Sequence, residues 1–118
     1  MATHVVRTAP LRTAHLTTFA NPTAIGNTAV IAAIPGGAIR VLGLALVNGG
    51  TANSVKFQSN TTDITALFAL GANGGVVLPF NEHGWCQTAV GEALNVNLTG
   101  ATPVGVQVSY IVVQADRG

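Results

Sequence analysis

LNVNLT, residues 94–99, is the stretch of this 118-residue chain that decides its fold class. Three apolar residues alternate with three polar ones, and a period of two is what a β-strand with one buried face requires. Residues 104–113, VGVQVSYIVV, repeat the signal, because four valines and Tyr110 fall on one face. The C-terminal part of the chain is therefore predicted to be β-structure.

Residues 38–48 are apolar on both alternating faces. A strand of this kind is usually central in its sheet and covered on both sides. We therefore expect this segment to be a central strand. Its two faces, by simple alternation, carry Ile39, Val41 and Val47 on one side and Leu42, Leu44 and Leu46 on the other.

Further short β-signals fill the chain from residue 28 onward, bounded by glycine, asparagine or proline. Pro79 indicates that the strand it interrupts lies at a sheet edge. Residues 64–70 fit either a strand or a short helix, and the glycine-rich sequence after them favours the strand. The expected strands are residues 28–34, 38–48, 55–58, 64–70, 76–80, 85–90, 94–99 and 104–113.

About eight short strands, with no helix of three turns, predict an all-β fold. The first choice is an antiparallel β-sandwich that is jelly-roll-like, and the second is an immunoglobulin-like sandwich. Residues 28–118 are expected to form this single sandwich domain.

Residues 1–27 differ from the rest, because no helical or alternating period holds for more than a few positions. We expect an extended N-terminal arm with one short strand near residues 15–19; the alternative is a disordered tail. The arm is favoured because a solvated tail rarely carries apolar anchors. Those anchors are Val5, Val6, Leu11, Leu16 and Phe19.

The chain is very poor in charge, with five Lys+Arg, four Asp+Glu and none of them between Leu94 and Ala115. An average domain of this length carries about 30 charged residues. Such a surface has to be covered by uncharged polar residues or by other protein, which points to an assembled, structural protein. The formal net charge of +1 gives no field to attract nucleic acid or an anionic membrane, so neither is an expected partner.

Catalysis needs acids, bases or nucleophiles that converge in a cleft. Asp63, Glu82, Glu92 and Asp116 are far apart in sequence, and each stands at an expected turn or terminus. The three histidines lack the spacing of metal ligands. The chain is therefore not expected to be an enzyme, and no metal or cofactor is expected.

Cys86 is the single cysteine, so an intramolecular disulfide is excluded. Its apolar neighbours predict a buried, inert thiol. The sequence shows neither a secretory signal nor an apolar run long enough for a membrane helix, so synthesis in a cytoplasm is expected.

Residues 39–113 resemble short, β-rich virion proteins of tailed bacteriophages. The resemblance is carried by turn and strand motifs, and it spans about two thirds of the chain. The motifs are IRVLG (39–43), VKFQS (55–59), TTDIT (61–65), ANGG (72–75), LPF (78–80), GW (84–85) and TAVGEALN (88–95).

The resemblance implies a head decoration (cement) protein on the capsid exterior, commonly a homotrimer that braces the major capsid protein. The family supplies no binding motif. From the residues themselves, the contacts expected with the capsid or within the oligomer are Arg7, Arg12, Leu16 and Phe19, because capsid exteriors are often acidic and apolar anchors favour an interface.

Two other functions remain open at this point. One is a tail, neck or fibre component of the virion. The other is a carbohydrate-binding module, which is disfavoured because most of the six aromatic residues fall on expected core faces.

Overall fold

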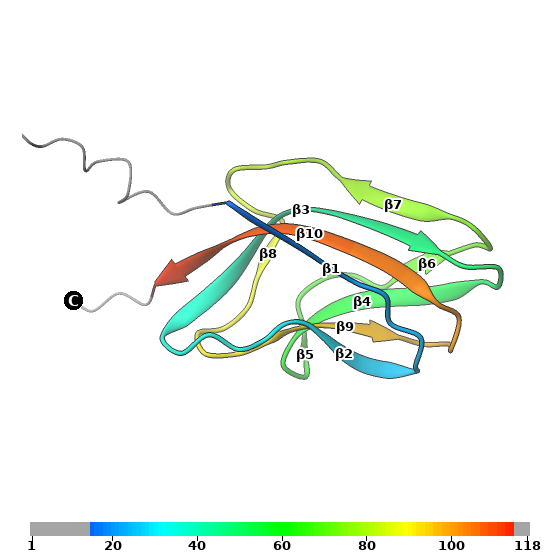
Figure 1. Cartoon of the computed structure of the whole chain (residues 1–118), viewed down its shortest axis with the longest axis horizontal. Helices are drawn as coiled ribbons and strands as arrows, with labels where there is room; N and C mark the ends of the chain where they lie inside the picture. The colour runs from blue at the N-terminus through cyan, green and yellow to red at the C-terminus, as the bar shows by residue number, and fades with distance from the viewer. Residues whose placement is uncertain (1–14, 115–118) are drawn as a thin grey trace, which may run out of the picture.

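The computed structural model describes residues 15–114, and these form an all-β structure of two antiparallel sheets without a helix (Figure 1). The strands are β1 (Leu16–Ala20), β2 (Gly26–Ile31), β3 (Gly37–Asn48), β4 (Asn53–Ser59), β5 (Thr62–Asp63), β6 (Phe68–Leu70), β7 (Gly75–Leu78), β8 (Cys86–Gln87), β9 (Leu94–Leu98) and β10 (Val104–Gln114).

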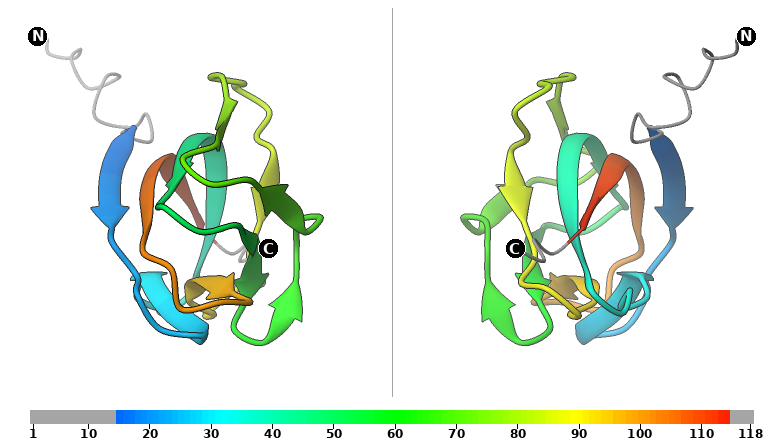
Figure 2. Two further views of the ribbon diagram at one scale, coloured as in Figure 1. Left: turned by 90° about the vertical axis from the view of Figure 1, so that its right-hand side faces the viewer. Right: turned by 90° about the vertical axis from the view of Figure 1, so that its left-hand side faces the viewer.

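The two sheets lie on opposite sides of one interior, as the end views of Figure 2 show. Sheet A has the strand order β1-β10-β3-β7, and β8 also pairs with β3. Sheet B has the order β2-β9-β4-β5, and β6 also pairs with β4. Successive strands from β1 to β4 alternate between the sheets, and the chain crosses again from β9 to β10. This sandwich-like arrangement confirms the predicted all-β class.

One apolar cluster fills the space between the sheets and draws on both of them. The alternation that the sequence shows in β9 and in the first half of β10 is confirmed, because every second residue of each is buried. Phe57, from β4, is the largest side chain that is fully buried. The other completely or almost completely buried members are Ile39, Val41, Leu46, Val55, Leu94, Val96, Leu98, Val104 and Val108.

The central position of β3 is confirmed, but the predicted assignment of its two faces is wrong. Its register with β10 shifts, so that Gly43 faces Ser109 while Val41 faces Tyr110 and Leu42 is an extra residue. A β-bulge of this kind reverses the parity of the alternation. Val41 and Leu44 consequently both belong to the core cluster, whereas Val47 is exposed.

Strand β8 is much shorter than the expected strand at residues 85–90. Beyond Gln87, the Thr88 hydroxyl accepts a hydrogen bond from the Ile39 backbone N–H at 2.9 Å, and the Thr88 N–H donates to the Ile39 carbonyl at the same distance. A side chain therefore takes the place of a backbone carbonyl next to β3. The expected strand at residues 64–70 is likewise reduced to β6, and the two-residue β5 was not expected.

Two parts of the predicted arm are strands of the sandwich: residues 16–20 belong to sheet A and residues 26–27 to sheet B. The short strand expected near residues 15–19 is confirmed as β1, which pairs with β10 from Leu16 to Ala20. Strand β2 begins at Gly26, inside the expected arm. Residues 1–14, with Arg7 and Arg12, lie outside the described residues.

Replacing Phe57 by alanine should lower the free energy of unfolding by about 3–5 kcal/mol, because it empties a fully enclosed site between the sheets. The control is Val90→Ala in the loop after β8, where the side chain is exposed and the change should stay within about 0.5 kcal/mol. Urea denaturation followed by tryptophan fluorescence measures both. Equal losses for the two variants would contradict the described core.

Candidate interaction surface

The outer face of sheet A, which points away from the core, carries several exposed large apolar side chains: Phe19, Val47, Val77 and Phe80. One row of residues crosses strands β1, β10, β3 and β7. In it, Phe19 faces Gln107, Gln107 faces Ala45 and Ala45 faces Val77. Phe19 and Val77, at the two ends of this row, are each 72% exposed. Directly opposed residues share one side of a sheet.

On the central strands β3 and β10, this row is flanked by the small residues Gly43, Gly105 and Ser109. The side chains of Phe19 and Val77 at the two edges project further from the sheet than these do. Among residues 15–114, the formally charged side chain on the outer side of sheet A is Arg40, which pairs with Ile111 and lies beside β8, and the residues around the row carry none. We define the outer face of sheet A as Thr17, Phe19, Gly43, Ala45, Val47, Gly75, Val77, Phe80, Gly105, Gln107 and Ser109.

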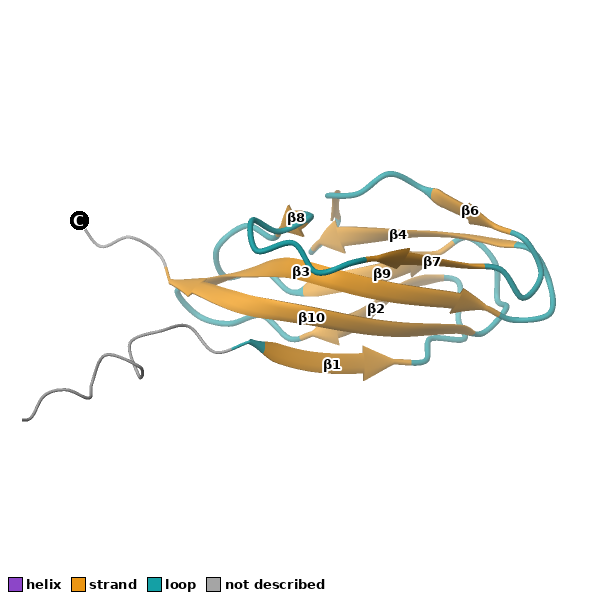
Figure 3. Ribbon diagram, turned by 90° about the horizontal axis from the view of Figure 1, so that it is seen from above, coloured by secondary structure: helices purple, strands orange, loops and turns teal. Residues whose placement is uncertain are grey.

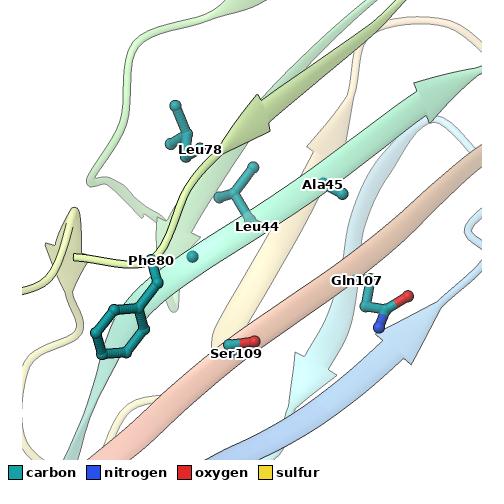
Figure 4. Close-up of a pocket in the computed structure, with 7 residues that line it drawn as sticks. Leu44, Ala45, Leu78, Phe80, Gln107 and Ser109 are labelled. Carbon is teal, nitrogen blue, oxygen red and sulfur yellow. The ribbon is translucent and has the colours of Figure 1, made fainter. Parts of the chain in front are cut away.

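Two open depressions lie side by side on this face and share Ala45 and Gln107. Figure 4 shows the first, of about 310 Å³, which extends between Phe80 and Gln107. The second, of about 300 Å³, has Phe19 and Gly105 in its lining. Together they form a shallow trough across β10 and β3, the two central strands seen from above in Figure 3.

The glycines of this face differ in whether the fold itself requires them. A Cβ at Gly75 would collide with the carbonyl oxygen of Leu46, and one at Gly43 would lie 3.2 Å from that of Leu78. A Cβ at Gly105 would meet nothing closer than 3.7 Å. Glycine inside a strand weakens it and often marks close approach of another chain. The packing of this molecule gives no reason for Gly105.

Phe80 is held at its margin of the face by the segment that follows β7. The indole Nε1 of Trp85 donates to the Pro79 carbonyl at 2.8 Å, and the Trp85 backbone N–H donates to the Val41 carbonyl at 2.7 Å. The ring of His15, which precedes β1, lies 5.5 Å from the Phe80 ring between centroids. Phe80 is thus placed by the segment after β7 and also contacts the residue that precedes β1.

The outer face of sheet B is polar, in contrast to that of sheet A. The Asn97 side-chain amide donates to the Asn27 side-chain oxygen at 2.6 Å, and the Asn95 amide donates to the Asn60 carbonyl at 2.8 Å. These asparagines are the polar partners in the LNVNLT alternation. Their amides bond one another and the backbone, which gives this face a hydrated, neutral surface.

An ion pair completes the polar face. The Lys56 Nζ lies 3.0 Å from an Asp63 carboxylate oxygen, and the Gln58 amide donates to Asp63 at 2.7 Å. The hydrogen bond from Gln58, followed by the one from Lys56, lowers the pKa of Asp63. The carboxylate is therefore kept charged on the side of the molecule opposite the trough.

The remaining acidic residues of the described chain are not gathered at one place. Glu92 accepts a hydrogen bond from the Ser59 hydroxyl at 2.6 Å. Glu82 and His83 lie 3.7 Å apart, and both side chains are largely exposed. No three His, Cys, Asp or Glu residues within 15–114 are grouped as metal ligands would be. Asp116 lies outside the described residues.

Cys86 is half-buried and packs against the core cluster. Burial raises the pKa of its thiol to about 11. A thiol that stays protonated is a poor nucleophile. This agrees with the predicted inert thiol, although its burial is only partial.

Of the two predicted contact residues that the structure describes, Leu16 and Phe19, it is Phe19 that lies on the outer face of sheet A. Leu16 is 41% exposed and pairs with Tyr110, so it points to the core side of β1. Arg7 and Arg12 lie outside the described residues. Val47, Val77 and Phe80 were not expected to be surface residues. The signal that could have found them is the apolar character of both faces of neighbouring strands.

The expectation that most aromatic residues are in the core is wrong. Phe57 is buried and Phe68 and Tyr110 are partly buried, but the other three are exposed. The aromatic residues that were wrongly expected in the core lie on edge strand β1 or in the segment after β7. At these positions the alternation of the sequence does not show which side of the chain packs against other strands. The exposed aromatic residues are Phe19, Phe80 and Trp85.

Comparison with family models, with curated proteins and with solved structures gave no match to this chain. Among residues 15–114, no helix has the length and apolar character needed to cross a bilayer.

Gly105→Ala should leave the free energy of unfolding unchanged or raise it by about 0.5–1 kcal/mol, because alanine is easier to order than glycine and its Cβ has room here. Gly75→Ala should lower the free energy of unfolding by about 1–3 kcal/mol, because its Cβ meets a backbone oxygen. Thermal and urea denaturation compare the two. A clear loss of stability in Gly105→Ala would show that the fold does need this glycine.

Cys86 in the native protein should react with a thiol reagent far more slowly than in the protein unfolded in urea. The rise of its pKa from 9.0 to about 11 leaves roughly a hundredfold less thiolate at neutral pH. Absorbance with a chromogenic disulfide reagent gives both rates. Similar rates in the two states would contradict the protected thiol.

Proposed function

We propose that this protein is a structural virion protein that decorates the exterior of a bacteriophage head, and that the outer face of sheet A rests on the major capsid protein. The observation that carries the proposal is the contrast between the two outer faces. One bears self-bonded asparagines and an ion pair, and the other bears exposed apolar side chains around an uncharged trough, with Arg40 beside β8 at one end. Exposed apolar patches of several hundred Å² usually mark a protein interface.

The scarcity of charge supports a role in an assembly. In residues 15–114 the formally charged side chains are few, and those with described partners lie off the trough: Arg40 donates to Gln87 at 2.8 Å, and Lys56 pairs with Asp63. A neutral face is displaced from water at little electrostatic cost when it docks. A cement protein needs such a broad, passive contact more than it needs a specific chemical site.

The strand order supports the jelly-roll form of the sandwich. With the two-residue β8 left out and β5 and β6 taken together as the fifth strand, the eight principal strands form sheets in the orders 1-8-3-6 and 2-7-4-5. This is the pairing pattern of two interleaved Greek keys. Jelly rolls occur in viral capsid proteins and also in lectins, so the fold favours this class of function without deciding it.

The N-terminal segment has a proposed role of its own. Arg7 and Arg12 would bind acidic groups on the capsid, while Phe19 contributes to the docking face. Because β1 begins at Leu16, a deletion that tests the arginines has to stop at residue 14. Loss of capsid binding in that deletion would assign a part of the contact to the arm. The homotrimer implied by the resemblance is an alternative to the two-fold pair proposed below, and the solution mass of the chain separates the two.

The decisive measurement is labelling of the virions of a phage whose genome encodes this chain, with antibodies raised against the purified chain. Regularly spaced label over the head supports a decoration protein. Label confined to the tail or neck would assign the chain to that part of the virion instead. Absence of label from all particles would refute a structural role. In that case the three exposed aromatic residues make a glycan array the next experiment.

Val77→Asp should abolish binding of the purified chain to such heads, because it places an unpaired charge in the docking face. The matched control is Ala29→Asp, which puts the same charge on an exposed position of edge strand β2, facing Asn95 on the polar side. Co-sedimentation with heads stripped of the protein measures binding. Equal binding by the two variants would exclude the outer face of sheet A as the contact.

A further inference from the structure

The edge strands of the two sheets differ in how they are protected against pairing with another chain. Exposed edges offer unpaired N–H and C=O groups, and proteins usually guard them with charge, proline, bulges or very short strands. Strand β2 has a register shift between Ala29 and Ile31. Strand β5 has two residues and the Lys56–Asp63 ion pair, and β7 ends immediately before Pro79. Each of these edges carries a recognised guard.

Strand β1 carries none of these guards. Its five residues, LTTFA, include no charge and no proline, and they pair with β10 without a register shift. It is the last strand of sheet A, and Figure 2 shows no described strand beyond it. Within residues 15–114, its only ladder is with β10. Half of its backbone polar groups therefore face outward, ready to pair with another strand.

We propose that β1 pairs antiparallel with β1 of a second copy of this chain, about a two-fold axis that passes near Thr18. A second copy of the chain fits this edge because a strand without charge meets its own copy without repulsion, whereas a charged partner strand would find no counter-charge. Two-fold association uses the same patch on both subunits, and an antiparallel strand pair satisfies that symmetry directly. The inference stands on the edge of sheet A and does not depend on the proposed function.

The pairing places side chains in compatible positions. With Thr18 on the axis, Thr17 of one copy faces Phe19 of the other on the outer side. Aromatic and β-branched residues are favourable cross-strand neighbours. On the inner side Leu16, which is 41% exposed in the single chain, faces the partner's Ala20 and is covered. Five paired residues exchange about four to six backbone hydrogen bonds.

Pairing through β1 would also join the docking surfaces of the two copies. Both copies of sheet A then form one continuous sheet, and their outer faces lie on the same side of it. The neutral trough of each copy is joined to the other along the two Phe19 rings. A pair of linked contacts binds a repetitive surface far more tightly than a single contact does.

The test is the solution mass of the full-length chain, measured by light scattering and native mass spectrometry. We expect a dimer of twice 11.9 kDa for the wild type. Thr17→Lys, which adds the usual guard of an edge strand, should give a monomer. Ala29→Lys on the guarded edge β2 and Val77→Asp on the opposite margin of sheet A should both remain dimers.

Each other outcome overturns the pairing. A dimer that Val77→Asp dissociates would show stacking through the outer face instead of the edge. A trimer would support the assembly implied by the resemblance and contradict a two-fold pair. A wild-type monomer at high concentration would also refute it. None of these masses depends on phage heads, so failure here is distinct from failure of the proposed function.

Disulfide trapping gives a second readout that does not rely on weakening the pair. Thr18→Cys should form a covalent dimer under mild oxidation, because the two residues meet at the axis with Cα atoms about 4.5–5.5 Å apart. Ala29→Cys is the matched control on the guarded edge and should stay monomeric on denaturing gels. The native Cys86 is half-buried and contributes equally to both variants. Equal cross-linking of the two variants would contradict specific pairing through β1.

Discussion

The antiparallel pairing of β3 with β10 is the interaction on which the rest of the structure depends. These two long strands hold one another through eleven registered residue pairs. Strand β1 attaches to the free side of β10, and β7 and β8 attach to the free side of β3. The bulge at Leu42 sets which side chains of β3 enter the core and which line the trough, because one extra residue reverses the alternation. The core and the candidate surface therefore have a common origin.

The two outer faces differ in what covers them in place of charged side chains. On sheet B, asparagine amides and one ion pair supply enough polarity for contact with water. On sheet A, glycine, alanine and exposed apolar residues leave a neutral trough that gains free energy when it is covered. A sandwich with one hydrated and one apolar side has a defined orientation on any larger surface. This property links the composition of the chain to the function proposed for it.

Much of the fold could be predicted from local alternation, and the errors have a shared cause. The alternation in β9 and in β10 identified buried residues correctly, since a half-buried strand shows its pattern within a few positions. The predicted faces of β3 were wrong because Leu42 is an extra residue in a bulge, and the position of a bulge depends on the pairing with β10. The exposed positions of Val77 and Phe80 could not be found, because their surroundings depend on which strands lie beside β7. Alternation also did not show that Thr88 would bond to Ile39 with its hydroxyl.

The sequence by itself determined the β class, the strands around residues 94–99 and 104–113 and the scarcity of charge. These are properties of composition and of a period of two, and both are read within one segment. Only the tertiary structure decided that Phe19, Ala45 and Val77 share one row, that Gly105 is free of the fold's own packing, and that β1 is an unguarded edge. Each of these depends on pairing between residues that are distant in the chain. The backbone hydrogen bonds that make such pairs are the same for every residue type, so the local sequence does not indicate which strand will be the partner.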